Sequence, residues 1–460
     1  MTVFPAIVPA GTLLYRGSPK NTTLHKSAWL SFEPEHALWH AAGRIGRDRA
    51  LQGLRVQQEV TETSVEQQVP LDGVSSNGWL VTYATSRPLR LIYLDGLSAA
   101  KSVRGTLDLQ DFLILDYDMI GLESKANDYR RASDLCDVIK DRWAGSVDGF
   151  IRAELGFEVI LCNPDAATLH SAVNGKAKGY DVDDYFHYWQ AALTGSHALA
   201  GDRVHVGSPL FTMFDTDEDL FSRGMHPRLL DVPRTRLAEH RTRLDGRILQ
   251  HDWEAPTHMA WQFATDAVVS RYARALQHMT TMQPLDVVKI QRQARILLGP
   301  FAGGSPADSA DTIGRCVHHS VHAIASTSSA YSAVYSVVHR ICSDLVALQD
   351  EQQIDAAQSR LGDLTDYLSW STWRECPSCE LDEVCFTPIY PLGDEEDAVS
   401  PSCVSADTLA GRQGYCQPPP IDAAAWPLPP RRPTQSRTLA AWSTAERRIC
   451  RPYPESPPRS

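Results

Sequence analysis

The stretch that decides how the first third of the chain folds reads Gly156-Phe157-Glu158-Val159-Ile160-Leu161-Cys162. A short apolar run that follows a glycine and ends close to Pro164 is typical of a buried strand. One carboxylate, that of Glu158, interrupts the apolar side chains. Side chains alternate between the two faces of a strand, so Glu158 either points to solvent from a half-exposed strand or has a chemical task. Both interpretations are open at this point.

Further short apolar runs lie around this stretch. We expect strands over residues 12–15, 79–85, 89–94, 112–115 and 157–162. Between them, residues 132–143 place Leu135, Ile139 and Trp143 on one face of a helix. Asp148-Gly149 is a tight-turn signal that precedes the last strand. Strands mixed with a helical pattern predict an α+β domain over residues 5–175.

The rest of the chain has a different pattern. Residues 176–370 predict a mainly helical region, with helical spacing over 251–300 and 311–370 and glycine and proline breaks between them. Residues 371–416 form a segment with a high density of cysteines. Residues 417–460 hold 11 prolines in 44 positions. Such a composition favours a disordered tail over a packed core.

Length, charge and hydropathy exclude some classes of function. A chain of 460 residues suggests two or three folding units. The formal net charge of −12 argues against a general nucleic-acid binder, which needs a basic surface. The positive charge is uneven, because 36 of the 44 cationic side chains are arginine and 8 are lysine. We also expect no transmembrane helix, because no apolar run reaches about 18 residues.

The ten cysteines fall into two groups. Four are scattered singly and are expected to be small buried apolar residues: Cys136, Cys162, Cys316 and Cys342. Six crowd the last fifth: Cys376, Cys379, Cys385, Cys403, Cys416 and Cys450. Disulfides are the leading interpretation for Cys376, Cys379, Cys385, Cys403 and Cys416, and free thiols are a further one. A zinc site would use Cys376, Cys379, Cys385 and Cys403, although a second C-x-x-C is missing, so no metal is assigned.

The cysteines also bear on the compartment. Residues 1–9 contain neither a basic region nor an apolar stretch long enough for a secretory signal, so the sequence as given indicates a cytoplasmic protein. The sequon Asn21-Thr22-Thr23 fits secretion. Paired cysteines in the last fifth would mean export and an incomplete start, whereas reduced cysteines would place the protein inside the cell.

Three phrases of the N-terminal domain resemble a known fold. Leu14-Tyr15-Arg16-Gly17 comes first, then Trp29-Leu30-Ser31-Phe32 ahead of the helical phrase 35–41, and then the late strand that carries Glu158. This order resembles the ADP-ribosyltransferase fold, over roughly the first 170 residues. It is also similar to a group of uncharacterised fungal proteins that contain the same phrases and the C-terminal cysteines.

The resemblance implies a split-sheet domain that holds NAD in a cleft without a glycine-rich dinucleotide turn. Glu158 would stabilise the positive charge that develops on the ribose carbon, as a carboxylate does in glycoside hydrolysis. Arg16 and Ser31 would hold the dinucleotide, and His40 or Trp39 would flank the nicotinamide. His40 stands where the family has an aromatic residue, and Gly156 stands where arginine-modifying members have Glu or Gln. Arginine is therefore a poor guess for the acceptor.

Two functions follow from these observations. The first is transfer of ADP-ribose from NAD to a protein or small-molecule acceptor, or hydrolysis of NAD. The alternative is a catalytically inactive interaction protein that binds partners through its helical region and tail. The enzyme hypothesis requires Glu158, Arg16 and His40 to converge on one open cleft, which a structure can show.

Overall fold

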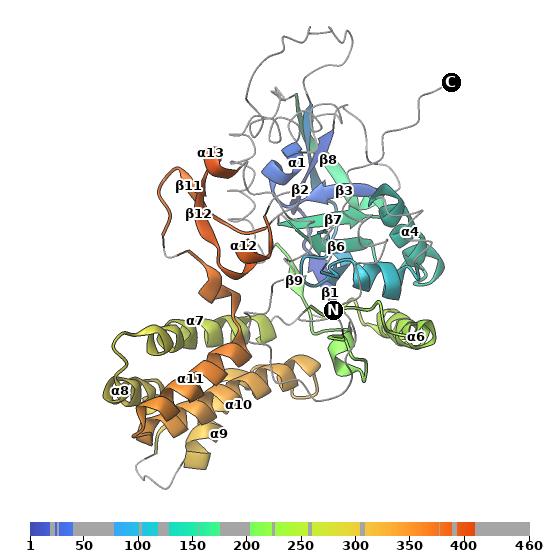
Figure 1. Cartoon of the computed structure of the whole chain (residues 1–460). Coiled ribbons are helices and arrows are strands. Elements are labelled where there is room, and N and C mark those ends of the chain that lie inside the picture. Colours follow the sequence, from blue (N-terminus) through green and yellow to red (C-terminus); the bar gives the residue numbers. More distant parts are fainter. Residues whose placement is uncertain are drawn as a thin grey trace. The chain divides into compact units, whose positions relative to one another are not determined.

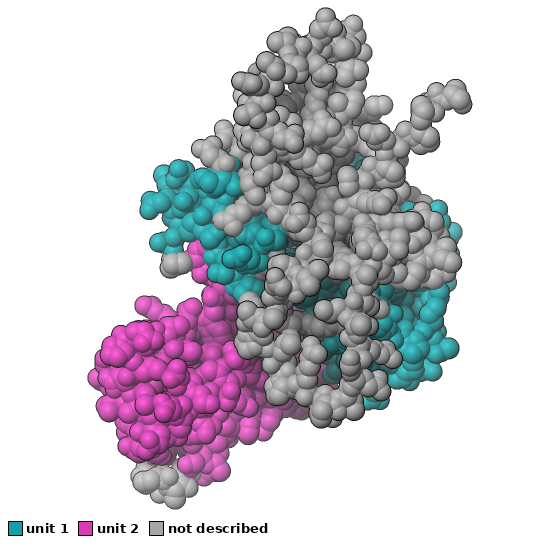
Figure 2. Space-filling view, in the orientation of Figure 1, with its two compact units in different colours: residues 1–205, 210–255, 378–460 teal, residues 206–209, 256–377 magenta. Residues whose placement is uncertain are grey.

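The computed structural model describes residues 1–18, 24, 27–39, 78–100, 104–117, 128–154, 156–174, 203–222, 226–255, 260–303, 309–376, 378–388 and 393–409. The chain forms two compact units (Figure 2). The first comprises residues 1–205, 210–255 and 378–460, and the second comprises residues 206–209 and 256–377. The predicted tail over 417–460 lies outside the described residues.

A single curled sheet of ten strands, counted among the described residues, dominates the first unit (Figure 1). Its main path runs β10-β1-β5-β6-β7-β3-β2-β4-β8. The strands are β1 Thr2–Val8, β2 Leu13–Ser18, β3 Ala28–Ser31, β4 Trp79–Thr85, β5 Leu89–Leu94, β6 Gly149–Ala153, β7 Phe157–Leu161, β8 Ala167–Asn174, β9 His205–Val206 and β10 Phe211–Thr212. Neighbours on the main path pair antiparallel except β5 and β6, which are parallel.

Both faces of the central strands are buried. All five residues of β7 are buried, which explains why its sequence is a continuous apolar run apart from Glu158. On one face, Phe150 and Ile160 join a core with the helical elements of this unit. On the other face, Ile151 and Val159 are fully buried as well. Glu158 is therefore not on a solvent-facing side of a half-exposed strand.

In the described part of this unit the sheet is accompanied by α1 Pro34–Trp39, the π-helix η1 Leu109–Ile114, α4 Asp128–Asp141 and α6 Arg234–Gln250. α4 buries Leu135 and Ile139, and α6 buries Leu244 and Ile248, in the same core as Phe150. Each pair is spaced by four residues, so each helix turns one apolar stripe toward the sheet. Short 3₁₀ turns occur at η2 Pro164–Ala166 and η3 Met213–Asp215.

The second unit is helical. It contains α7 Ala260–Thr281, α8 Val287–Leu298, α9 Ser309–Val321, α10 Ser329–Asp350 and α11 Ile354–Leu368, with 3₁₀ turns at η4 Gly299–Phe301 and η5 Ser371–Arg374. Its core is separate from that of the sheet unit and includes Tyr272, Ile290, Ile341 and Leu361. Among the described residues, no helix is both long enough and apolar enough to span a membrane.

The cysteine segment forms a small hairpin. β11 Glu383–Phe386 pairs antiparallel with β12 Ser402–Ser405, and α12 Glu395–Val399 and α13 Ala406–Leu409 flank β12 in the sequence. α12 begins at Asp394, whose carboxylate accepts hydrogen bonds from the backbone N–H groups of Glu396 and Asp397. The acidic run that starts at Asp394 thus caps a helix.

The expected α+β class is confirmed. The strands predicted over 79–85 and 89–94 coincide with β4 and β5, and 12–15 and 157–162 overlap β2 and β7. The strand predicted over 112–115 is wrong, because these residues belong to η1 and its end. A four-residue apolar run does not distinguish a strand from a buried helical turn.

Candidate functional site

The three strands that carry the predicted site residues are neighbours. β3 lies between β7 and β2 (Figure 1). Ser31 on β3 pairs with Glu158 on β7 on one side and with Tyr15 on β2 on the other. Directly opposed residues of paired strands place their side chains on the same face. Tyr15, Ser31 and Glu158 therefore form one row across the sheet.

Arg16 does not belong to this row. It follows Tyr15 along β2, so its side chain lies on the opposite face of the sheet from Glu158. There its guanidinium donates a hydrogen bond to the hydroxyl of Tyr83. Burial raises the pKa of Tyr83, and the charge of Arg16 offsets part of this increase. The Nη1 atom of Arg16 is buried without a hydrogen-bond partner.

Glu158 is held by an arginine from the neighbouring strand. Arg152 on β6 pairs directly with Glu158, and both its Nε, at 2.7 Å, and its Nη2 donate to Oε1 of Glu158. The Nη1 of Arg152 donates to Oε1 of Gln110 on η1 at 3.0 Å. Glu158 is 9% exposed, Arg152 2% and Gln110 1%. The carboxylate is thus paired with a cation inside the core.

The other predicted residues are placed as follows. Ser31 is buried, and its hydroxyl donates to the backbone carbonyl of Glu33 at 2.9 Å. The backbone of Trp39 ends α1, whereas its side chain and the whole of His40 lie outside the described residues. Glu158 and Arg16 lie on opposite faces of the sheet and do not converge on one cleft.

A larger polar layer surrounds η1. Asp108, just before η1, accepts from Arg228 Nε at 2.9 Å. Asp111 accepts from Arg131 through Nε at 2.8 Å and Nη2 at 2.9 Å. Further arginines bind the backbone carbonyls of the segment. These are Arg241, which donates to Phe112 and Leu113, and Arg142, which donates to Ile114.

This layer explains part of the arginine excess. A guanidinium has five donors in a planar fork and can bind a carboxylate through two parallel hydrogen bonds, which a lysine ammonium cannot do. Burial by itself would lower the pKa of Arg131, but the charges of Asp111 and Asp128 outweigh it and raise the pKa. Arg131 is therefore a permanent cation. The layer stabilises the fold, because each of these buried carboxylates is neutralised by an arginine of the same unit.

The four scattered cysteines are buried or half-buried, as small apolar residues are, but they are paired. Cys136 on α4 forms a disulfide with Cys162, the residue after β7, and Cys316 on α9 forms one with Cys342 on α10. Four scattered cysteines allow three pairings, so their partners are fixed by the fold and not by their spacing.

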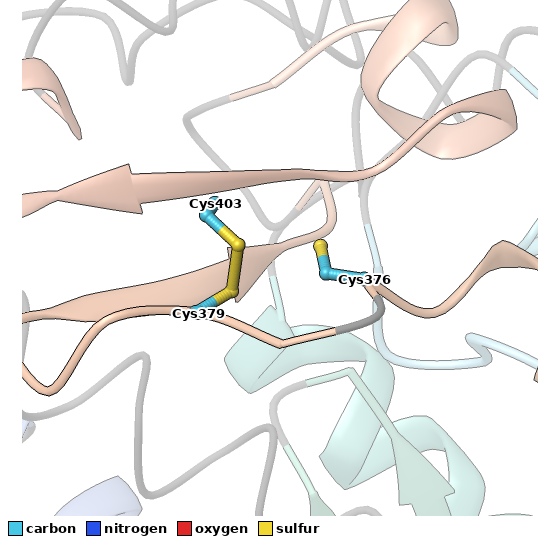
Figure 3. A group of neighbouring side chains, drawn as sticks. All are labelled: Cys376, Cys379 and Cys403. Atoms are coloured by element: carbon cyan, nitrogen blue, oxygen red, sulfur yellow. A yellow bond between two sulfur atoms is a disulfide. The ribbon is translucent and has the colours of Figure 1, made fainter.

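Sulfur atoms gather at the hairpin of the cysteine segment. Cys379 and Cys403 form a disulfide, and Cys376 lies beside it (Figure 3). Sulfur atoms of Cys376, Cys379 and Cys403 all lie within 4.8 Å of one another. Cys385 lies opposite Cys403 across the hairpin, and Cys376 and Cys385 each take part in a further disulfide. Cys416 and Cys450 lie outside the described residues.

Sequence reasoning identified Glu158 but missed its partners. Arg152 stands in the apolar run of β6, six positions before Glu158, with Gly156 between them at a positive φ of 90°. A hairpin through this turn puts Arg152 opposite Glu158, so the signal was present in the sequence. No comparable signal marks Gln110 or Asp111, because a π-helix has no distinctive residue pattern.

Comparisons with known proteins give relatives but no described activity. Residues 48–179 match a family model described as the YPL277C N-terminal domain. The chain is homologous to the uncharacterized protein YOR389W of Saccharomyces cerevisiae, with 22% identity over 86% of this chain and 79% of that protein. It is also homologous to the uncharacterized protein YPL277C of the same yeast, with 29% identity over 35% of this chain and 36% of that protein. No solved structure matches.

Proposed function

We propose that this chain is a binding protein whose sheet unit is a scaffold, and that Glu158 holds the fold instead of reacting with NAD. The observation that carries this proposal is the buried ion pair between Glu158 and Arg152. A buried carboxylate with a bound cation has its charge compensated within the fold.

The electrostatics of the pair support the proposal. Cleavage of a nicotinamide bond builds positive charge on the ribose carbon, and a catalytic carboxylate must offer negative charge to it. The guanidinium of Arg152 lies within hydrogen-bond distance of the carboxylate of Glu158. A cation so close to the reacting centre would repel the developing positive charge.

The helical unit offers surface for a partner. Its helices expose large apolar side chains, among them Phe263 on α7 at 67% and Val288 and Ile296 on α8 at 64% and 57%. Apolar area removed from water stabilises a complex, and fully buried apolar anchors dominate many interfaces. This is the region through which an interaction protein would bind.

ADP-ribosyl transfer or NAD hydrolysis on an ADP-ribosyltransferase-like split sheet is the second candidate. It is favoured by the adjacency of β2, β3 and β7 and by the direct pairing of Ser31 with Glu158. In that case Glu158 would have to leave Arg152 when NAD binds.

Nicotinamide release from NAD by the purified full chain distinguishes the two. The assay contains a mixed protein extract as acceptor and compares the wild type, Glu158→Gln, and the control Glu239→Gln. Glu239 is an acid on α6 with a 60% exposed side chain. We expect all three to release nicotinamide at the rate of the extract alone. Release by the wild type and by Glu239→Gln that is lost in Glu158→Gln would establish the enzyme.

A further inference from the structure

The cluster of Cys376, Cys379 and Cys403 in the cysteine segment has no part in the proposed function. Its three cysteines come from two places. Cys376 and Cys379 form the C-x-x-C, and Cys403 comes from β12 (Figure 3). Their sulfur atoms lie within 4.8 Å of one another. Side chains that are distant in sequence are thus held together at one point of the fold.

The spacing fits a tetrahedral thiolate site. Zinc binds cysteine sulfur at about 2.3 Å, so two sulfurs on one tetrahedral ion are about 3.8 Å apart. The three sulfurs lie within 4.8 Å of one another, and reduction of the Cys379–Cys403 disulfide would free its two bonded sulfurs to move apart to that separation. A C-x-x-C supplies two such ligands from one turn. Three thiolates would leave one position of a tetrahedral ion for a further ligand such as water.

The exposure of these cysteines differs from that of the other pairs. Cys376, Cys379 and Cys403 are partly exposed. Cys316 and Cys342 are fully buried, and Cys136 is 5% exposed. Exposed disulfides are reduced more readily than buried structural ones, because the attacking thiolate must reach a sulfur atom. A dithiol reductant would therefore open the disulfides of this group first.

We propose that, when their disulfides are reduced, Cys376, Cys379 and Cys403 bind a thiophilic divalent cation such as Zn²⁺. Each disulfide takes two electrons and two protons from a dithiol reductant, which becomes a disulfide itself. The cation then binds the thiolates, and one proton leaves to solvent for each thiol that coordinates. The segment thus has a disulfide-bonded form and a metal-bound form.

Zinc binding by the full chain tests the proposal. The protein is reduced anaerobically with a dithiol, the dithiol is removed by gel filtration, and Zn²⁺ is titrated against a chromophoric chelator. The variant Cys379→Ser/Cys403→Ser removes both ends of one disulfide from the group. The matched control Cys316→Ser/Cys342→Ser removes both ends of a disulfide elsewhere. Cys376→Ser probes the third ligand.

We expect one Zn²⁺ per reduced wild-type chain and per reduced control, and none in the oxidised chain. The affinity falls by about tenfold or more in Cys376→Ser and in Cys379→Ser/Cys403→Ser. The proposal is overturned if the reduced wild type takes up no more zinc than the oxidised chain, or if Cys379→Ser/Cys403→Ser binds as tightly as the control.

A second measurement needs no variant and so does not depend on whether a variant folds. Zinc added to the reduced wild type should slow alkylation of Cys376, Cys379 and Cys403, as read by mass spectrometry of peptides. Alkylation of the same three cysteines in the reduced chain without zinc provides the reference. Equal alkylation of the three cysteines with and without zinc would contradict the site.

Discussion

At the scale of single residues, the main finding is how the sheet unit uses arginine. Arg131, Arg152 and Arg228 each bind a buried carboxylate. Each pair fixes two segments of the chain relative to one another, because a planar fork accepts few geometries. Arg16 differs from them, since its hydrogen bond is to the hydroxyl of Tyr83.

Neighbouring arginines on α4 allow a matched comparison. Arg131 is 1% exposed and pairs with Asp111, whereas the side chain of Arg130 is 55% exposed and pairs with Asp134. Removing one partner of a buried pair leaves an uncompensated charge, so Arg131→Met should lower the free energy of unfolding by about 3–5 kcal/mol. Arg130→Met should lower it by less than about 1 kcal/mol. Urea unfolding checks both, and equal losses would show that the buried layer has no special role.

Glu218 gives the unit a dependence on pH. A hydrogen bond with Nε2 of His240, at 2.8 Å, and then the interaction with Arg236, lower the pKa of Glu218 below its ordinary value of 4.5. The unfolded chain therefore takes up this proton first as the pH falls. The stability that Glu218 contributes is present above its unfolded pKa and is lost as the pH falls through its folded pKa.

We expect the urea midpoint of the wild type to fall between about pH 6 and about pH 3. Glu218→Gln should show a shallower fall, because a neutral amide has no proton to take up. Glu239→Gln is the control, since Glu239 contacts the same Arg236 with an exposed side chain. A slope for Glu218→Gln as steep as that of the control would refute the linkage.

At the scale of elements, η1 carries more of the fold than its six residues suggest. Residues 109–114 are all buried, and three polar side chains in or next to η1 bind arginines from three other places in the chain. The sequence predicted a strand in its second half. That interpretation failed because the apolar pattern of a short buried segment is the same for either structure, and the long-range arginine partners decide which one forms.

The hairpin of β6 and β7 shows which contacts of Glu158 the sequence could predict and which it could not. The apolar runs and the turn at Asp148-Gly149 predicted the strand of Glu158. The pairing of Arg152 with Glu158 could also have been predicted, because a hairpin reverses the chain between them. The other partner of Arg152, Gln110, lies 42 positions earlier in the chain, and sequence spacing does not determine such a contact.

At the scale of the whole molecule, local patterns predicted the α+β class and the helices of the second unit. β1 was missed, because Pro5 and Pro9 weaken the strand pattern of residues 2–8, although β1 pairs along β5. That Arg16 and Glu158 lie on different faces of the sheet depends on the register of strand pairing. A shift of one residue would have placed both on the same face, and no local pattern fixes that choice.

The two disulfides between scattered cysteines form a matched pair, one in each unit. Both close 26 residues, so loop-closure entropy gives each about 3.5 kcal/mol of stabilisation. Cys136→Ser/Cys162→Ser should speed amide exchange in α4 and the sheet. Cys316→Ser/Cys342→Ser should do so in α9 and α10. Hydrogen-exchange mass spectrometry reads both, and a loss of protection across both units in either variant would contradict the local effect expected of each disulfide.

The same disulfides bear on the compartment. Stable disulfides form in oxidising environments, so pairing of these cysteines in the native protein is the inference to be tested. Peptide mapping without reduction should recover the links Cys136–Cys162, Cys316–Cys342 and Cys379–Cys403. Recovery of these cysteines as alkylated thiols from protein isolated from its natural source would contradict that inference.

The central claim is that Glu158 serves the fold through Arg152. A double-mutant cycle on the free energy of unfolding tests it most directly, with wild type, Glu158→Gln, Arg152→Met and the double variant. We expect each single change to cost about 3–5 kcal/mol and the double variant to be no less stable than the weaker single variant, because neither charge is then left unpaired. Glu158→Gln as stable as the wild type, with no coupling to Arg152→Met, would contradict the claim.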